Sequence, residues 1–140
     1  MRRMLTMTAA TTAALLLSVQ PATAGGDRPA TFATAASWDN WMYTDDAGSG
    51  GRVQFRAYGD VMRLCDVEAD GRAVALDVTD QTTGHTYSRR IGGEGRCLEL
   101  RASLGAPYDL AEKHLILVQI ILTKVGEPGT GRDSAVWWNG

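Results

Sequence analysis

Short segments in which apolar and polar residues alternate constrain the fold of this chain more than any other feature of its sequence. The alternation is clearest over residues 52–58 and 73–79, and glycine-containing turns follow several of these segments. A period of two places every second side chain on the same face of an extended strand. The pattern therefore predicts half-buried β-strands rather than amphipathic helices.

Five further segments bring the number of predicted strands to seven: 61–67, 87–91, 97–100, 115–122 and 134–138. The segment 115–122, LILVQIIL, is nearly apolar on both faces and is compatible with a buried helix or a central strand. Its isoleucine and valine content favours a strand. A capping-box pattern between Asp109 and Glu112 keeps the helix as the alternative.

Seven short strands without intervening helices predict an all-β fold, a seven-stranded antiparallel sandwich of two sheets. Immunoglobulin-like and jelly-roll topologies fit this pattern equally well. We expect three parts in the chain: a signal peptide at 1–24, a flexible N-terminal segment with an aromatic stretch at 25–50, and the sandwich domain at 51–140.

The first 24 residues follow the three-part order of a secretory signal peptide. Arg2 and Arg3 form a positive head, an apolar run follows over 9–19, and the tripeptide 22–24 is Ala-Thr-Ala. This run is shorter than the roughly 20 residues that span a bilayer. We expect a secreted, extracellular protein with no integral membrane segment after cleavage. The arginine pair leaves open whether export uses the Sec or the twin-arginine route.

Charge and cysteine content narrow the possible partners and chemistry. Cleavage after residue 24 removes two of the 14 basic residues and none of the 16 acidic residues, and the remaining charges are interspersed. Without a basic stripe, nucleic acid is not an expected partner. Cys65 and Cys97 are the only cysteines, and in an exported chain they are expected to form one disulfide. The alternatives are a reactive thiol or a metal-binding pair, but two ligands without nearby histidine or cysteine partners do not make a zinc site.

The stretch DVEADGRAVALD, residues 66–77, fits two structures. Five of its residues match positions 1, 3, 5, 6 and 12 of a calcium-binding loop: Asp66, Glu68, Asp70, Gly71 and Asp77. Position 12 is normally a longer glutamate, position 9 is apolar here, and no helix flanks the loop. The pair Asp70-Gly71 between two strand-like segments instead predicts a β-hairpin. We therefore expect no metal site and no cofactor.

No catalytic constellation is visible in the sequence. A hydrolytic triad needs a nucleophile, a nearby histidine and a group that orients the histidine. The chain has only His85, beside a turn glycine, and His114, at the start of an apolar strand, and both are expected at the surface. Ser134 has no Gly-x-Ser-x-Gly elbow around it.

The tryptophans lie near the two ends of the mature chain: Trp38, Trp41, Trp137 and Trp138. First and last strands are often neighbours in a sandwich, so these rings could meet in one aromatic patch. Our candidate ligand-binding residues are Trp38, Trp41, Tyr43 and Trp138. Packing is the interpretation that we favour for these rings, because tryptophan is usually mostly buried. In that case Trp137 would fill the core, Trp138 would cover an edge, and the other two would cap the open end.

The run RVQFRAYGDVMRLCDVEADGRAVALDV resembles small, exported, single-domain proteins of actinobacteria, with a GD…CD…DG core and a later cysteine. The resemblance covers about residues 51–122 and implies an exported β-sandwich of no established activity. Similar chains often carry a further cysteine pair near the last strands, where this chain has Val118, Ile120 and Trp137.

Two classes of function are compatible with these features. The first, which we favour because no catalytic constellation is visible, is a secreted non-catalytic protein that binds an extracellular protein or carbohydrate through the terminal aromatic residues. The alternative is a small extracellular hydrolase or an inhibitor of hydrolases such as proteases.

Overall fold

The computed structural model describes residues 37–140. The predicted signal peptide at 1–24, and residues 25–36 of the predicted N-terminal segment, lie outside the described residues. Within residues 37–140, no helix reaches the length and hydropathy that crossing a membrane requires.

Eight strands form between residues 37 and 140: β1 (Asn40–Tyr43), β2 (Gly51–Arg56), β3 (Val61–Asp66), β4 (Ala73–Asp80), β5 (Thr86–Gly92), β6 (Cys97–Leu100), β7 (His114–Lys124) and β8 (Glu127–Asn139). A single 3-10 turn, η1 (Ala102–Leu104), follows β6. The segment that was compatible with a buried helix lies within β7, so the strand prediction is confirmed there. All seven predicted strands are present, and β1 is an eighth.

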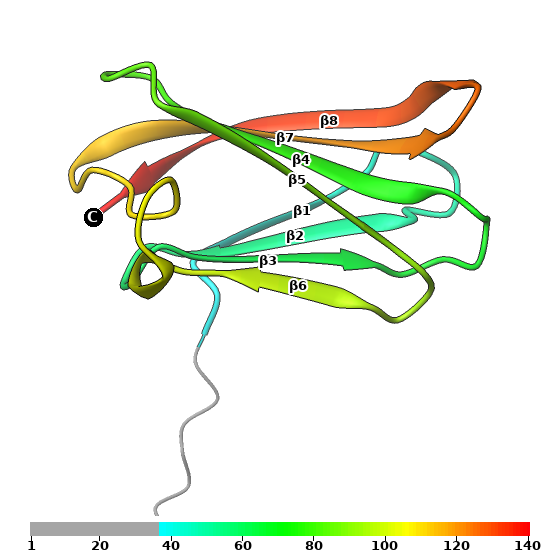
Figure 1. Ribbon diagram of the computed structural model, residues 1–140, viewed down its shortest axis with the longest axis horizontal. Helices are drawn as coiled ribbons and strands as arrows, with labels where there is room; N and C mark the ends of the chain where they lie inside the picture. The colour runs from blue at the N-terminus through cyan, green and yellow to red at the C-terminus, as the bar shows by residue number, and fades with distance from the viewer. Residues whose placement is uncertain (1–36) are drawn as a thin grey trace, which may run out of the picture. The chain divides into compact units, whose positions relative to one another are not determined.

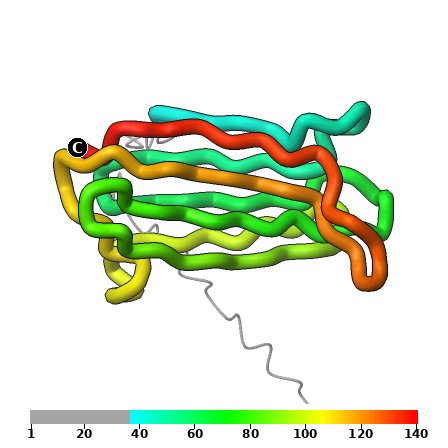
Figure 2. Tube along the Cα trace, turned by 90° about the horizontal axis from the view of Figure 1, so that it is seen from above, coloured from blue at the N-terminus to red at the C-terminus, as the bar shows by residue number. Residues whose placement is uncertain are grey.

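The strands make two four-stranded antiparallel sheets that pack face to face as a sandwich (Figure 1). The strand order is β1-β2-β3-β6 in the first sheet and β5-β4-β7-β8 in the second. β1 and β8 are edge strands of different sheets, and Figure 2 shows them running side by side along one side of the sandwich. The predicted antiparallel two-sheet fold is confirmed, with four strands in each sheet.

The core lies between the two sheets and follows the alternation of the sequence. In β2 and β4 every second residue is buried, as the period of two requires. Phe55 of β2 and Trp137 of β8 join the layers, because their rings stack with centroids 5.9 Å apart. The largest fully buried apolar side chains are Phe55, Met62, Leu64, Leu76, Ile116 and Ile120.

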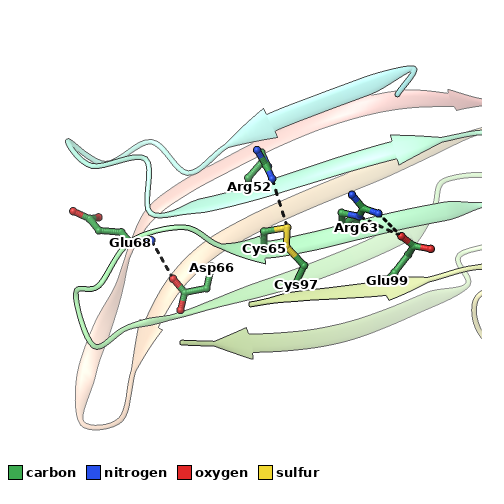
Figure 3. The surroundings of a disulfide bond; sticks show 7 residues. All are labelled: Arg52, Arg63, Cys65, Asp66, Glu68, Cys97 and Glu99. Carbon is green, nitrogen blue, oxygen red and sulfur yellow. Dashed lines mark hydrogen bonds and ion pairs between the residues drawn. A yellow bond between two sulfur atoms is a disulfide. The ribbon is translucent and has the colours of Figure 1, made fainter. Parts of the chain in front are cut away.

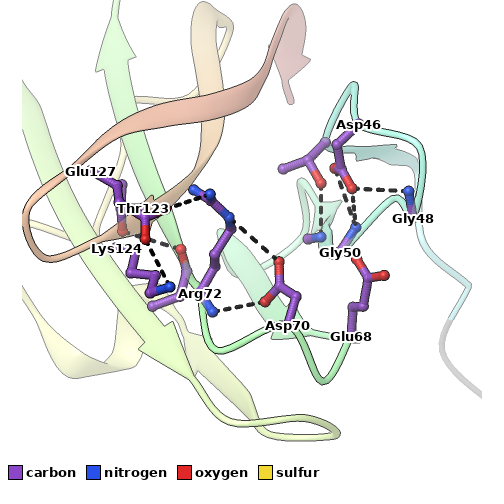
Figure 4. Close-up of polar contacts among 12 residues, drawn as sticks. Asp46, Gly48, Gly50, Glu68, Asp70, Arg72, Thr123, Lys124 and Glu127 are labelled. Atoms are coloured by element: carbon purple, nitrogen blue, oxygen red, sulfur yellow. Dashed lines mark hydrogen bonds and ion pairs between the residues drawn. The ribbon is translucent and has the colours of Figure 1, made fainter.

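Residues 40–50, which the sequence placed in a flexible segment, belong to the sandwich. β1 pairs with β2 from Asn40 opposite Phe55 to Tyr43 opposite Arg52. In the following loop, the Asp46 carboxylate accepts hydrogen bonds from the backbone N–H groups of Gly48 and Gly50 (Figure 4). β1 was not predicted because four residues with one buried side chain are too few to show the alternation of a strand.

The predicted hairpin at Asp70-Gly71 is wrong, although the turn exists. Gly71 has φ of +70°, and the Asp70 carboxylate accepts a hydrogen bond of 2.7 Å from the Arg72 backbone N–H. However, β3 pairs with β2 and β6, whereas β4 pairs with β5 and β7. The segment between β3 and β4 therefore crosses from one sheet to the other. Turn chemistry is local and does not determine whether the two flanking strands pair.

Candidate functional site

Two exposed aromatic side chains of β1 project from the outer face of the first sheet. Met42 is buried between the sheets, so its neighbours Trp41 and Tyr43 point the other way. Trp41 is 62% exposed and Tyr43 is 42% exposed. Tryptophan is usually mostly buried, so this degree of exposure marks the outer face as a candidate binding surface.

Arginines continue the same face across the sheet. The register places Tyr43 opposite Arg52 and then Cys65, and it places Arg63 of β3 opposite Glu99 of β6. Figure 3 shows Arg52, Arg63 and Glu99 on adjoining strands around the disulfide. We call this surface the arginine–aromatic face and define it by Trp38, Trp41, Tyr43, Arg52, Arg56, Arg63, Glu99 and Arg101.

Arg63 is fixed at the centre of this face by contacts on two sides. Its guanidinium carbon lies 4.9 Å from the centroid of the half-buried Trp38 ring, which is cation–π distance. Its Nη2 and Nε donate to the same Glu99 oxygen at 2.8 and 3.2 Å. Arg101 also forms an ion pair with Glu99. The hydrogen bond from Arg63 and the positive charge of Arg101 together lower the pKa of Glu99.

Arg52 and Arg56 leave positive charge on the face that no carboxylate neutralises. Among the described residues, neither forms an ion pair, and the Nε atom of each is buried without a hydrogen-bond partner. The nearest polar contact of Arg52 is from Nη2 to the Cys65 sulfur, at 3.8 Å. At the border of the face, the Asp39 carboxylate accepts a hydrogen bond from the Ala57 N–H instead of pairing with Arg56.

A depression of about 490 Å³ lies at one end of the arginine–aromatic face. Its lining includes Arg56, Val61 and Arg101, together with Tyr58, which is 90% exposed. Glu112 is its single acidic lining residue. The volume falls within the range of small-ligand pockets, and two of its lining residues are positively charged arginines.

The structure separates the candidate aromatic residues into two groups. Trp38, Trp41 and Tyr43 lie on the arginine–aromatic face. Trp137 is 7% exposed and packs in the core, as the packing interpretation predicts. The next residue, Trp138, points to the outer face of the second sheet, where its partner across the strands is Leu115. Trp138 is therefore not part of one patch with the β1 aromatics, although β1 and β8 are neighbours.

The carboxylates of the candidate calcium loop have separate partners. Asp66 is buried and accepts a hydrogen bond of 2.7 Å from the Gly93 N–H. Glu68 lies against the loop that contains Gly48 and Gly50 (Figure 4). Asp77, on β4, accepts a hydrogen bond from Ser88. Among residues 37–140 no group of three histidine, cysteine, aspartate or glutamate side chains could hold a metal ion.

An aspartate–histidine pair is the feature that sequence reasoning missed. His114 Nδ1 lies 2.7 Å from the Asp80 carboxylate, which also accepts hydrogen bonds from the backbone of Thr82 and Thr83. Burial by itself raises the pKa of Asp80, but these hydrogen bonds outweigh it and lower the pKa to about 2. In the part of the chain that the structure describes, no serine or cysteine hydrogen-bonds to His114.

The pair lies beside a depression of about 280 Å³ whose lining includes Asp80, Thr83 and His85. His85 does not join His114, because its Nε2 contacts the Pro107 carbonyl at 3.2 Å. The pairing of β4 with β7 brings Asp80 close to His114. No local sequence signal connects two residues so far apart in the chain.

The predicted disulfide is confirmed between Cys65 and Cys97. It joins β3 to β6 within the first sheet rather than bridging the two sheets. It therefore attaches the short edge strand β6, with Glu99, to the strand that carries Arg63.

No family model matches this chain, and comparisons with curated proteins and with solved structures find no significant match. The resemblance to exported actinobacterial proteins stays a prediction.

Proposed function

We propose that this protein is a secreted, non-catalytic binding protein that holds an extracellular carbohydrate or protein on its arginine–aromatic face. The observation that carries the proposal is the 62% exposure of Trp41 on a strand that also exposes Tyr43, which lies opposite Arg52. Trp, Tyr and Arg are the residues that contribute most binding energy at recognition surfaces.

The rigidity of the face supports this function. Most of its side chains come from hydrogen-bonded strands, Trp38 and Arg101 lie directly beside strand ends, and Trp38 and Glu99 hold Arg63 in place. A partner therefore meets groups that are already positioned, which reduces the conformational entropy lost on binding.

The predicted export of the chain agrees with the same function. The signal-peptide pattern predicts secretion, and the Cys65–Cys97 disulfide is compatible with an oxidising compartment. A secreted protein with a preformed surface and no visible catalytic constellation is best explained by recognition.

The proposal is tested by tryptophan fluorescence of the secreted protein during titration with panels of extracellular polysaccharides and secreted proteins. Trp41→Ala should weaken binding of any partner that is found by at least about fivefold, the loss expected for an anchoring side chain. Trp138→Ala is the matched control, because it removes an exposed tryptophan from the opposite face, and it should leave affinity unchanged. Equal losses in the two variants would place the binding surface elsewhere.

A second candidate, a small hydrolase, is favoured by one observation. Asp80 orients His114 in the manner of the acid and base of a catalytic triad. Hydrolysis of ester or peptide substrates that disappears in His114→Ala, while the variant keeps its fold by circular dichroism, would support this candidate. Activity that survives the substitution would exclude His114 as the base.

A further inference from the structure

We propose that the partner of the arginine–aromatic face is an acidic polysaccharide that is recognised through its carboxylate groups. This inference rests on the proposed binding function and specifies its ligand class. It follows from the charge of the face, the spacing of its arginines, and the size and shape of the surface.

The charge of the face calls for an anionic ligand. Its outward side chains include four arginines and one glutamate, and Glu99 is already shared by Arg63 and Arg101. Arg52 and Arg56 have no carboxylate partner among the described residues. Guanidinium groups bind carboxylates through two parallel hydrogen bonds, so arginine selects this group more strongly than lysine does.

The spacing of the arginines suits a polymer that carries negative charges at regular intervals. Arg52 and Arg56 are four residues apart on β2, which corresponds to about 13 Å along a strand. Arg63 lies on the neighbouring strand β3, and Arg101 follows the last residue of β6. The positive charges thus extend from the disulfide to the 490 Å³ depression, where Arg56 and Arg101 lie together. A polymer with one carboxylate on each sugar could occupy several of these sites.

Aromatic side chains beside the arginines suit the uncharged parts of such a polymer. Trp41 lies opposite Gln54 and Tyr43 lies opposite Arg52, so the exposed aromatic residues of the edge strand β1 flank the polar and charged side chains of β2. The C–H face of a sugar ring can pack against a flat aromatic ring by dispersion. A strand face of another small β-fold, the OB-fold, also contributes to oligosaccharide binding.

The dimensions of the face favour a carbohydrate chain over a folded protein or a peptide. Four strands and about six residues define a face of roughly 15 by 20 Å in projection, which is small for an interface in which each partner usually buries approximately 800 Å² of accessible surface. Peptides usually add to a sheet edge or enter a groove. The main-chain groups of the central strands β2 and β3 are used within the sheet, so a peptide could add a strand only at the edges, β1 or β6, and not across the face.

The inference is tested by isothermal titration of the secreted protein with polygalacturonate and, as a matched ligand, with its fully methyl-esterified form. We expect binding of the acid form that weakens as salt rises, and at least tenfold weaker binding of the neutral ester. Arg56→Gln combined with Arg101→Gln should reduce affinity for the acid form at least tenfold. Arg90→Gln combined with Arg132→Gln changes the net charge equally on the second sheet and should have little effect.

Arg56→Lys separates the geometry of recognition from charge alone. It keeps the positive charge but removes the planar fork, so it should also weaken binding. Melting temperatures of all variants establish that the fold is kept. Equal affinity for the methyl ester would overturn the inference, as would equal or tighter binding of poly-glutamate or a single-stranded oligonucleotide. Failure with polygalacturonate together with Trp41-dependent binding of a neutral glycan or a protein would reject this ligand class and leave the proposed binding function standing.

Discussion

Replacing Asp80 by asparagine should lower the free energy of unfolding by about 2 kcal/mol at pH 7. The Asp80 side chain is 2% exposed, and its pKa falls from 3.8 to about 2 in the folded protein. Each pKa unit corresponds to about 1.4 kcal/mol of preferential interaction with the charged form. Asparagine keeps the shape of the side chain but removes the charge that Thr82, Thr83 and His114 stabilise.

The pH dependence of this loss tests its electrostatic origin. A carboxylate with a depressed folded pKa stabilises the protein above its unfolded pKa, and the contribution disappears as pH falls through the folded value. The difference between wild type and Asp80→Asn should therefore be constant above about pH 5 and shrink to about 1 kcal/mol at pH 3.

Urea denaturation followed by tryptophan fluorescence at pH 7, 5 and 3 measures this difference directly. Asp45→Asn, at an exposed position, is the control and should change stability little at any of these pH values. A loss for Asp80→Asn that is as large at pH 3 as at pH 7 would refute the electrostatic argument and point to packing.

Three further predictions concern the Cys65–Cys97 disulfide, the hydrophobic core and the arginine–aromatic face. Replacing Cys65 and Cys97 by serine should lower the free energy of unfolding by about 3–4 kcal/mol, because the disulfide closes a loop with a sequence separation of 32 residues; chemical denaturation measures the loss, and an unchanged midpoint would contradict it. Trp137→Ala should cost about 3–5 kcal/mol in the same assay, whereas Trp138→Ala should stay within about 0.5 kcal/mol; similar values would contradict their assigned burial. Glu112→Gln, which removes the acidic group from the depression, should tighten binding of polygalacturonate severalfold in titration calorimetry, and weaker binding would argue against carboxylate recognition there.

Much of the fold could be predicted from the sequence because its determinants are local. The alternation of Val74, Leu76 and Val78 identifies β4 and its buried face without knowledge of its neighbours. The β-branched content of residues 115–122 correctly favours a strand over a helix. The disulfide could be predicted because the chain has only two cysteines and because an exported protein is expected in an oxidising compartment.

The candidate site required the tertiary structure because its residues meet through strand pairing. The sequence determined that Trp41 and Trp138 lie near the two ends of residues 37–140, but only the assignment of β1 and β8 to different sheets places their side chains on opposite outer faces. The arginine–aromatic face and the Asp80–His114 pair arise in the same way. Side-chain alternation is a property of a single strand, whereas sheet membership and register depend on contacts between distant segments. The sequence alone therefore determined which residues point inward in the clearly alternating strands β2 and β4, and the tertiary structure decided which outward residues become neighbours.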